Sequence, residues 1–190
     1  MIPAHPGDVL AVPGGGAGGW LVRLGQLIAR KPSTEGHVVI VTHKDVQGRW
    51  IGIQGDPGGV ALCDCTPFLD DSRISSNHQQ PRLEGVRLTT FLAGAAKSLG
   101  IAYDWVGIAE DAALAVAPDL GPDIDRLWRW PSDKNILPGH VVCSSLAAML
   151  YDLPAVGWAH PDLGTERVCL PSDWDTWNRG EGWVNQLSHS

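Results

Sequence analysis

Three short apolar runs lie one after another between residues 37 and 65, and turn sequences separate them. The runs are HVVIVTH, RWIGIQ and VALCDC, and the segments between them, KDVQG and GDPGG, carry the Gly, Asp and Pro residues of hairpin connections. Strands joined by such short connections can pair only in the antiparallel direction, because a parallel pair needs a long crossover. The sequence therefore predicts an antiparallel meander, and this feature limits the fold more than any other.

Helical patterns follow the strands along the chain. The predicted helices cover residues 20–30, 89–99, 105–116 and 143–151. The polar segment 66–84 and the Pro- and Gly-containing segment 118–139 are predicted to be long irregular loops. An additional turn and strand, PGDVLAV, precede the first of these helices. Strands first and helices later indicate an α+β domain, with an antiparallel sheet packed against helices.

The chain length favours one domain. The 190 residues fit a single domain, 1–190, with a Trp- and Pro-rich C-terminal segment from about residue 152. A domain of this size buries roughly 70% of its unfolded surface and can fold without a metal or a disulfide scaffold. Cys63 and Cys65 are interpreted as half-buried strand cysteines, because no second close pair of ligands completes a zinc site. We expect no cofactor.

Charge and hydropathy exclude several function classes. A net charge of −7 leaves no basic surface for a nucleic acid. Since no apolar run approaches the roughly 18 residues that span a bilayer, we expect no stable membrane insertion. The N-terminal segment lacks the basic start and apolar core of a signal peptide, so we expect the chain to stay in the cytoplasm where it is made. The excess of Arg over Lys is typical of a GC-rich bacterial or bacteriophage genome.

Cys143 is the candidate nucleophile. Pro138 and Gly139 interrupt the chain, and SSLAAMLY then has helical character, so Cys143 should lie in the first turn of a helix. The unpaired N–H groups and the dipole of that turn favour a thiolate and could also bind an oxyanion. The alternative for an isolated cysteine at this place is ordinary packing.

His37 is the candidate base, and Gln54 is the candidate residue that orients it. His37 opens its strand, and if that strand pairs with the next one through KDVQG, Gln54 lies close to the imidazole. A side-chain carbonyl there would accept the ring N–H and select the tautomer. His140 and His43 are the competing bases: His140 precedes the helix and should point away, and His43 lies at the far end of the strand.

Several short motifs carry a resemblance to a known family. The segments GIAYDWVGIA and VVCSSLAAMLY are similar to the two blocks that lead into and carry the nucleophile in NlpC-type cysteine peptidases, relatives of papain that cleave bacterial cell-wall peptides. The segments PGDVLAV, GHVVIV and WIGIQGD are similar to the following blocks of that family. Here they precede the cysteine, which is the order of the circularly permuted branch, the YiiX-like and lecithin–retinol acyltransferase relatives. The Tyr103-Asp104 and Cys143-Ser144 pairs also resemble the YiiX-like group.

The resemblance implies a papain-like fold and a set of site residues. It makes Cys143 the nucleophile, His37 the base, Gln54 the third residue and Tyr103 a hydroxyl near the nucleophile that helps bind the oxyanion. The chain departs from the family in having Gln where Glu or His is common, and Cys-Ser-Ser in place of Cys-Ser-Gly or Cys-Ser-Glu. The implied function is a cysteine peptidase or amidase acting on a peptide or cell-wall substrate.

Two other functions remain open at this stage. The same thiol could transfer or hydrolyse lipid acyl groups, as the acyltransferase relatives do. The fold could also serve as a non-catalytic binding protein or phage structural protein. The aromatic cluster Trp174, Trp177 and Trp183 could stack on sugar rings or a peptide, although packing into the domain is the favoured interpretation.

Overall fold

A four-stranded antiparallel sheet forms the centre of the computed structural model. The described residues are 4–15, 19, 22–23, 26–27, 33–56, 58–70, 82–103, 140–141, 143–151, 153, 156, 158–159, 171–179 and 184–185. The sheet has the order β1-β2-β3-β4, with β1 (Val9–Pro13), β2 (Glu35–Lys44), β3 (Trp50–Asp56) and β4 (Gly59–Asp64). The predicted meander is confirmed, and β1 adds a fourth strand beside β2.

Both faces of the sheet are buried at its centre, which explains why Val9–Val12 and Val38–Val41 are continuous apolar runs. Alternate residues of a strand point to opposite faces. One face carries Val9, Ala11, Val38, Ile40 and Ile53, and the other carries Leu10, Val12, Val39 and Val41. A sheet that is covered on one side only would show polar residues at every second position.

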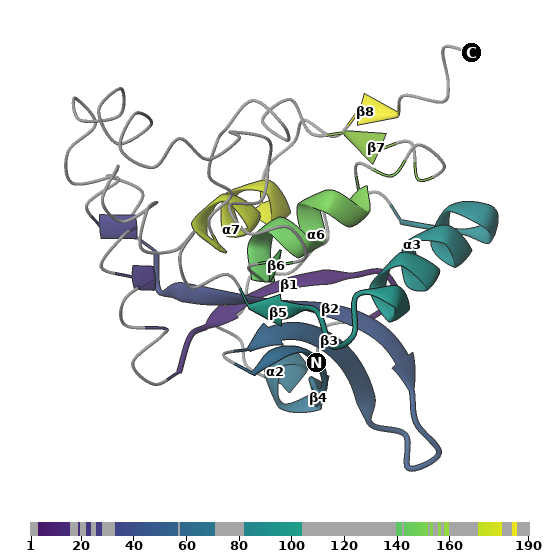
Figure 1. The fold of residues 1–190 in the computed structure, drawn as a ribbon, viewed down its shortest axis with the longest axis horizontal. Coiled ribbons are helices and arrows are strands. Elements are labelled where there is room, and N and C mark those ends of the chain that lie inside the picture. The colour runs from purple at the N-terminus through teal and green to yellow at the C-terminus, as the bar shows by residue number, and fades with distance from the viewer. Residues whose placement is uncertain are drawn as a thin grey trace.

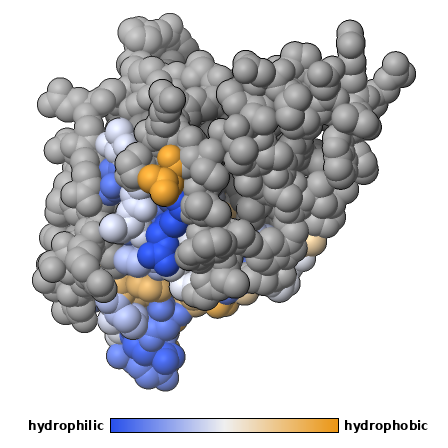
Figure 2. Space-filling view, turned by 90° about the vertical axis from the view of Figure 1, so that its left-hand side faces the viewer, coloured by the Kyte–Doolittle hydropathy of each residue, from blue (hydrophilic) through white to orange (hydrophobic). Residues whose placement is uncertain are grey.

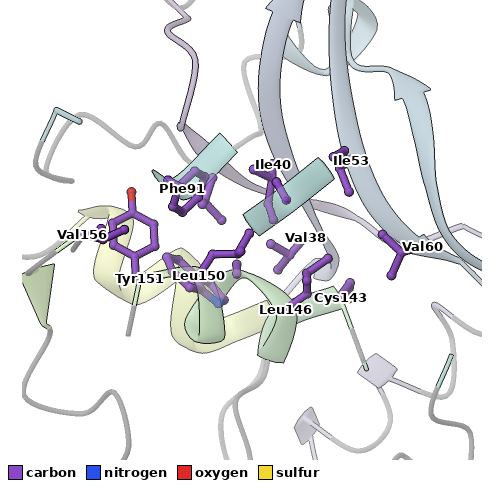
Figure 3. Packing of buried hydrophobic residues seen from close by; sticks show 14 of the residues in the cluster. Val38, Ile40, Ile53, Val60, Phe91, Cys143, Leu146, Leu150, Tyr151 and Val156 are labelled. Atoms are coloured by element: carbon purple, nitrogen blue, oxygen red, sulfur yellow. The ribbon is translucent and has the colours of Figure 1, made fainter. Parts of the chain in front are cut away.

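Helices cover the two faces unequally. The larger core lies under α3 (Gly85–Lys97), α6 (Cys143–Tyr151) and α7 (Pro171–Arg179), whereas α2 (Thr66–Asp70) packs on the opposite face. Figure 1 shows α6 and α7 on one side of the sheet and α2 on the other. Figure 3 shows side chains of α6, including Leu146, pointing toward strand residues such as Val38. The α+β class is therefore confirmed at the level of a sheet packed against helices.

Two short strand pairs complete the described structure. The strands β5 (Ala102–Tyr103) and β6 (His140–Val141) pair in parallel, and β7 (Trp158–Ala159) and β8 (Val184–Asn185) pair antiparallel. The helix predicted from residue 143 to 151 has those bounds. The helix predicted at 89–99 begins four residues earlier, at Gly85, and ends at Lys97. The predicted helix 105–116 and the predicted loop 118–139 lie outside the described residues.

The prediction of a long loop from 66 to 84 was wrong at its beginning. Residues Thr66–Asp70 form α2, because the side chain of Asp64 accepts a hydrogen bond from the Thr66 N–H at 3.0 Å and so caps the first turn. Leu69 is buried and Phe68 is partly buried against the second face of the sheet, and this burial stabilises a helix of only five residues.

The C-terminal segment contributes to the larger core, which also contains residues of α3 and α6. Trp174 of α7 is fully buried and its ring centroid lies 5.7 Å from that of Tyr151. Its indole N–H donates to the carbonyl of Ser144 at 3.1 Å, and the Asn178 amide donates to the carbonyl of Val9 at 3.0 Å. Packing is thus the role of Trp174, whereas the side chain of Trp177 and all of Trp183 lie outside the described residues.

Six large apolar side chains of the described residues are exposed. Exposed large apolar side chains sit on separate elements, such as Val46 in the β2–β3 turn, Leu62 on β4 and Val86 on α3. The coloured atoms on the face seen in Figure 2 are largely hydrophilic, with a few separate apolar spots. Isolated spots of this kind are normal for a folded protein. Within the described residues, no helix has the length and apolar character needed to cross a membrane.

Candidate active site

The site begins where two strands of the sheet separate. The pairing of β2 with β3 ends at Val39 and Gln54, although β2 starts at Glu35 and β3 continues to Asp56. Val41 bonds through both its N–H and its carbonyl to the chain just before β1. Because these groups alternate in direction along a strand, the N–H of Val38 points toward the β3 side, where the sheet pairing has stopped.

The start of α6 lies beside β2 at the point where β3 no longer pairs with it. Cys143 is the first residue of α6, and its sulfur accepts hydrogen bonds from the backbone N–H groups of Val38 and Ser144. The Val38 N–H thus has a partner, as a buried backbone donor requires. The other donor belongs to the first helical turn, where N–H groups have no partner within the helix. Cys143 is 4% exposed, so the thiol is held in a buried position between sheet and helix.

His37 and Cys143 shift each other's pKa in opposite directions. Burial opposes protonation of His37, but the charge of Cys143 and hydrogen bonds to Cys143 and Gln54 outweigh it and raise the pKa of the imidazole to about 9. Burial likewise opposes ionisation of Cys143, but the charge of His37 and the hydrogen bonds to the sulfur hold the pKa of the thiol below its usual value. Both shifts favour the form of the pair in which Cys143 is a thiolate and His37 is an imidazolium.

The other described cysteines have the opposite character. Burial, followed by the charge of Asp56, raises the pKa of Cys63 to about 11. Burial, followed by the charge of Cys63, raises the pKa of Cys65 to about 12. Cys63 is half-buried as predicted, whereas Cys65 lies just beyond β4 and is fully buried. Both are neutral thiols at pH 7.

Within the described residues, no group of three or more His, Cys, Asp or Glu side chains could hold a metal ion.

Gln54 contacts His37 and is itself held by a carboxylate. The amide N–H of Gln54 donates to Asp56 Oδ2 at 2.6 Å, so its carbonyl end faces the imidazole. The distance from Gln54 Oε1 to His37 Nε2 is 3.1 Å. Because Oε1 can only accept, Nε2 carries a proton, and Nδ1 is the ring nitrogen left for the thiol. Asp56 was not among the site residues predicted from the sequence, although its position two residues after Gln54 places it on the same strand face.

Tyr103 reaches the thiol from a different part of the chain. Its segment is fixed to β4, since the Val60 N–H donates to Ile101 and the Gly100 N–H donates to Val60, both at 2.8 Å. Tyr103 then pairs with Val141 through β5 and β6, two residues before Cys143. Its hydroxyl is hydrogen-bonded to Cys143, and burial, followed by the charge of Cys143, raises the pKa of the hydroxyl well above its usual value. Tyr103 is therefore a neutral hydrogen-bond donor.

A glycine allows these groups to approach one another. A Cβ atom at Gly55 would lie 3.2 Å from the ring of Tyr103 and 3.3 Å from the backbone nitrogen of Cys143. These contacts are tighter than side chains normally accept, so any larger residue would push the start of α6 away from β3. The lack of a side chain at Gly55 thus helps to set the position of the thiol.

The structure brings together the four predicted site residues and places His43, one of the two competing histidines, away from them. Cys143, His37, Gln54 and Tyr103 are joined by the contacts above. His43 lies at the other end of β2, where its Nδ1 is 3.0 Å from the Thr42 hydroxyl. The backbone of His140 forms part of β6, but its side chain is not among the parts that the structure describes. Asp104 and Cys169 also lie outside the described residues.

The arrangement can supply a nucleophile, a base and donors for a developing negative charge. The nucleophile is the Cys143 thiolate, the base is the His37 imidazole, and the donors are the N–H groups of the first α6 turn together with the Tyr103 hydroxyl.

In comparisons with known proteins, no family model matches this chain and no curated protein shows significant similarity to it.

Proposed function

We propose that this protein is a cysteine hydrolase that cleaves amide bonds, with Cys143 as nucleophile and His37 as general base. The observation that carries the proposal is the hydrogen-bonded pair of these two side chains, in which the pKa of the thiol is lowered and that of the imidazole is raised. A buried cysteine that served only for packing would have a raised pKa, as Cys63 and Cys65 do.

The geometry supports an acyl-enzyme mechanism. The Cys143 thiolate attacks the carbonyl carbon of the amide, a C–S bond forms, and the carbonyl electron pair moves to oxygen. Backbone N–H groups of the first α6 turn and the Tyr103 hydroxyl stabilise this oxyanion. The His37 imidazolium gives its proton to the leaving nitrogen as the C–N bond breaks, leaving a thioester. Neutral His37 then takes a proton from water, whose oxygen attacks the thioester carbon; the C–S bond breaks, the carboxylic acid leaves, and Cys143 is again a thiolate beside the His37 imidazolium.

The fold and the substrate class follow from the resemblance of the motifs. We place the chain in the circularly permuted, papain-like branch of the NlpC-type peptidases, because the His strand, the polar residue and the Cys helix occur in the permuted order. A sheet that contacts the first residue of the cysteine helix is compatible with that fold. Peptidoglycan-type peptides are the substrate that this resemblance favours.

The test is cleavage of peptidoglycan stem peptides, followed by mass spectrometry of the products. The wild-type protein should release cleaved peptides, and Cys143→Ala and Cys143→Ser should remove this activity while the circular dichroism spectrum stays unchanged. Cys63→Ala is the matched control, because it removes a half-buried thiol that stays protonated, and it should remain active.

A second arm separates the alternative functions. The protein is incubated with a short-chain phospholipid ester, and its intact mass is measured. An acyl adduct on Cys143 formed only from the lipid would replace the amidase proposal with lipid acyl transfer. No cleavage of either substrate, together with a Cys143 that reacts no faster than Cys63 with iodoacetamide, would favour a non-catalytic protein.

A further inference from the structure

We infer that Asp56 is a positioning residue of this site: its carboxylate orients the Gln54 amide toward His37 and places a negative charge behind the imidazolium. The inference rests on the proposed function in so far as the His37–Cys143 pair is the catalytic pair. Asp56 itself is hydrogen-bonded to Gln54, so it acts through that residue and through its charge.

The Asp56 carboxylate fixes the direction of the Gln54 amide. A glutamine amide has an acceptor end and a donor end of nearly the same shape, and either end can face a neighbour. A carboxylate only accepts hydrogen bonds, so at 2.6 Å from Asp56 Oδ2 the Gln54 nitrogen must be the donor. Oε1 then faces His37 Nε2 at 3.1 Å. Without the carboxylate, the amide could turn its own N–H groups toward the ring N–H.

The Asp56 carboxylate also acts on His37 through its charge. The groups that act on His37 are Cys143 on α6 and Gln54 and Asp56 on β3, while Tyr103 on β5 is hydrogen-bonded to the thiol. The negative charge of Asp56 favours the protonated imidazole and adds to the effects of Cys143 and Gln54. A glutamine alone accepts the ring proton but supplies no net charge. The Gln54–Asp56 pair thus does together what a single carboxylate would do as the third member of a triad.

The backbone of Asp56 is well placed for this role. Asp56 ends β3 and pairs with Gly59 at the start of β4, so the two strands fix its main chain. Gly59 has a φ of +111°, a conformation that glycine adopts readily. Gln54 and Asp56 are two residues apart on one strand, and their side chains therefore lie on the same face. This spacing lets a short carboxylate reach the amide beside it.

The test compares Asp56→Asn with Asp64→Asn. Both variants remove one negative charge from the sheet, but Asp64 pairs with Ile51 at the opposite end of the β3–β4 ladder. The ring nitrogen shifts of His37 are followed by NMR against pH, which reports both the pKa and the tautomer and needs no substrate. Asp56→Asn should lower the titration midpoint from about 9 by about one pH unit and weaken the Nε2–H signature. Asp64→Asn should leave both unchanged.

Kinetics and a rescue variant complete the test. Asp56→Asn should lower kcat about 10-fold with KM unchanged, since Asp56 orients a catalytic group through Gln54. Asp56→Glu keeps the charge and the acceptor, so it should retain the raised midpoint and most of kcat. A midpoint and tautomer in Asp56→Asn equal to those of the wild type would overturn the inference even if the protein is a peptidase. Conversely, a lowered midpoint in a protein that cleaves no amide would support the Asp56 contact and refute the proposed function.

Discussion

The backbone N–H of Val38 donates a hydrogen bond to the sulfur of Cys143. This contact exists because β2 pairs with β3 only as far as Val39. The Val38 N–H, which points to the β3 side, therefore has no partner on β3 and bonds to Cys143 at the start of α6. The thiol therefore occupies a place that backbone atoms of a neighbouring strand would otherwise take. The same separation of the strands leaves the Gln54 and Asp56 side chains at the end of β3, where Gln54 reaches the imidazole.

The first prediction concerns the order in which the cysteines react. With limiting iodoacetamide near neutral pH, Cys143 should be alkylated before the other three cysteines, because only a thiolate is strongly nucleophilic. Cys63 and Cys65, with pKa values of about 11 and about 12, should stay almost unlabelled in the folded protein. Peptide mass spectrometry gives the order of labelling. Faster labelling of Cys63, Cys65 or Cys169 would contradict the assignment.

The second prediction tests the source of the thiolate. His37→Ala removes the positive charge and the hydrogen bond that lower the pKa of Cys143, while the burial that opposes ionisation remains. Alkylation of Cys143 at pH 7 should slow by on the order of 10- to 100-fold, and its pH profile should move to higher pH. His43→Ala is the control, since His43 is exposed and contacts Thr42, and it should leave the profile in place.

The third prediction is the pH dependence of amide hydrolysis. The His37 imidazolium, with its pKa raised to about 9, must protonate the leaving nitrogen, so kcat/KM should fall as the pH rises through about 9 and the ring loses its proton. At low pH, activity should fall only below the lowered pKa of Cys143, where the thiolate becomes protonated. Initial rates across a pH series give both limbs. A single rise centred above pH 8, as for an ordinary thiol, would count against the ion pair.

The fourth prediction concerns Gln54. Gln54→Ala removes the acceptor for His37 Nε2, so the ring can rotate, and kcat/KM should fall on the order of 10- to 100-fold. Gln54→Glu keeps an acceptor and adds a charge beside the imidazolium, but it also places a carboxylate 2.6 Å from Asp56. The double variant Gln54→Glu, Asp56→Asn relieves that repulsion and should retain or raise activity. Equal activity of Gln54→Ala and the wild type would remove Gln54 from the site.

The fifth prediction uses a matched pair of glycines. Gly55→Ala places a methyl group 3.3 Å from the backbone nitrogen of Cys143, so the start of α6 must shift by a few tenths of an ångström. Since a displacement of about 1 Å can cost about 100-fold in rate, this smaller shift should lower kcat/KM by up to about 10-fold. Gly58→Ala adds the same methyl group where no atom lies within 4 Å, and activity should be unchanged. An equal effect of both substitutions would indicate a general loss of stability.

Much of this site could be predicted from local sequence. The turns after His43 and Gln54 determine that the three strands form a meander, which brings His37 and Gln54 onto neighbouring strands. Pro138-Gly139 followed by SSLAAMLY predicted that a helix starts at Cys143, and α6 starts there. These features depend on a few adjacent residues, so they can be predicted from a single sequence.

Other features were outside the reach of local patterns. The helix α2 looked like part of a polar loop because its capping by Asp64 and the burial of Leu69 depend on the sheet beside it. The role of Asp56 depends on the direction of the Gln54 side chain, which a sequence pattern does not contain. The burial of Trp174 depends on α6 and Tyr151, which come from a different part of the chain.

The sequence by itself determined the strands, their antiparallel order and the helix that begins at Cys143, since hydrophobic periodicity and turn residues act over a few positions. Only the tertiary structure decided that β2 and β3 separate at Val39 and Gln54 and that the start of α6 enters there. That outcome follows from packing α6 onto the sheet, where Leu146 and Ala147 join Val38 and Ile53 in one core. The mutual charges and hydrogen bonds of His37 and Cys143 then outweigh their burial, so the pKa of the imidazole is raised and that of the thiol is lowered.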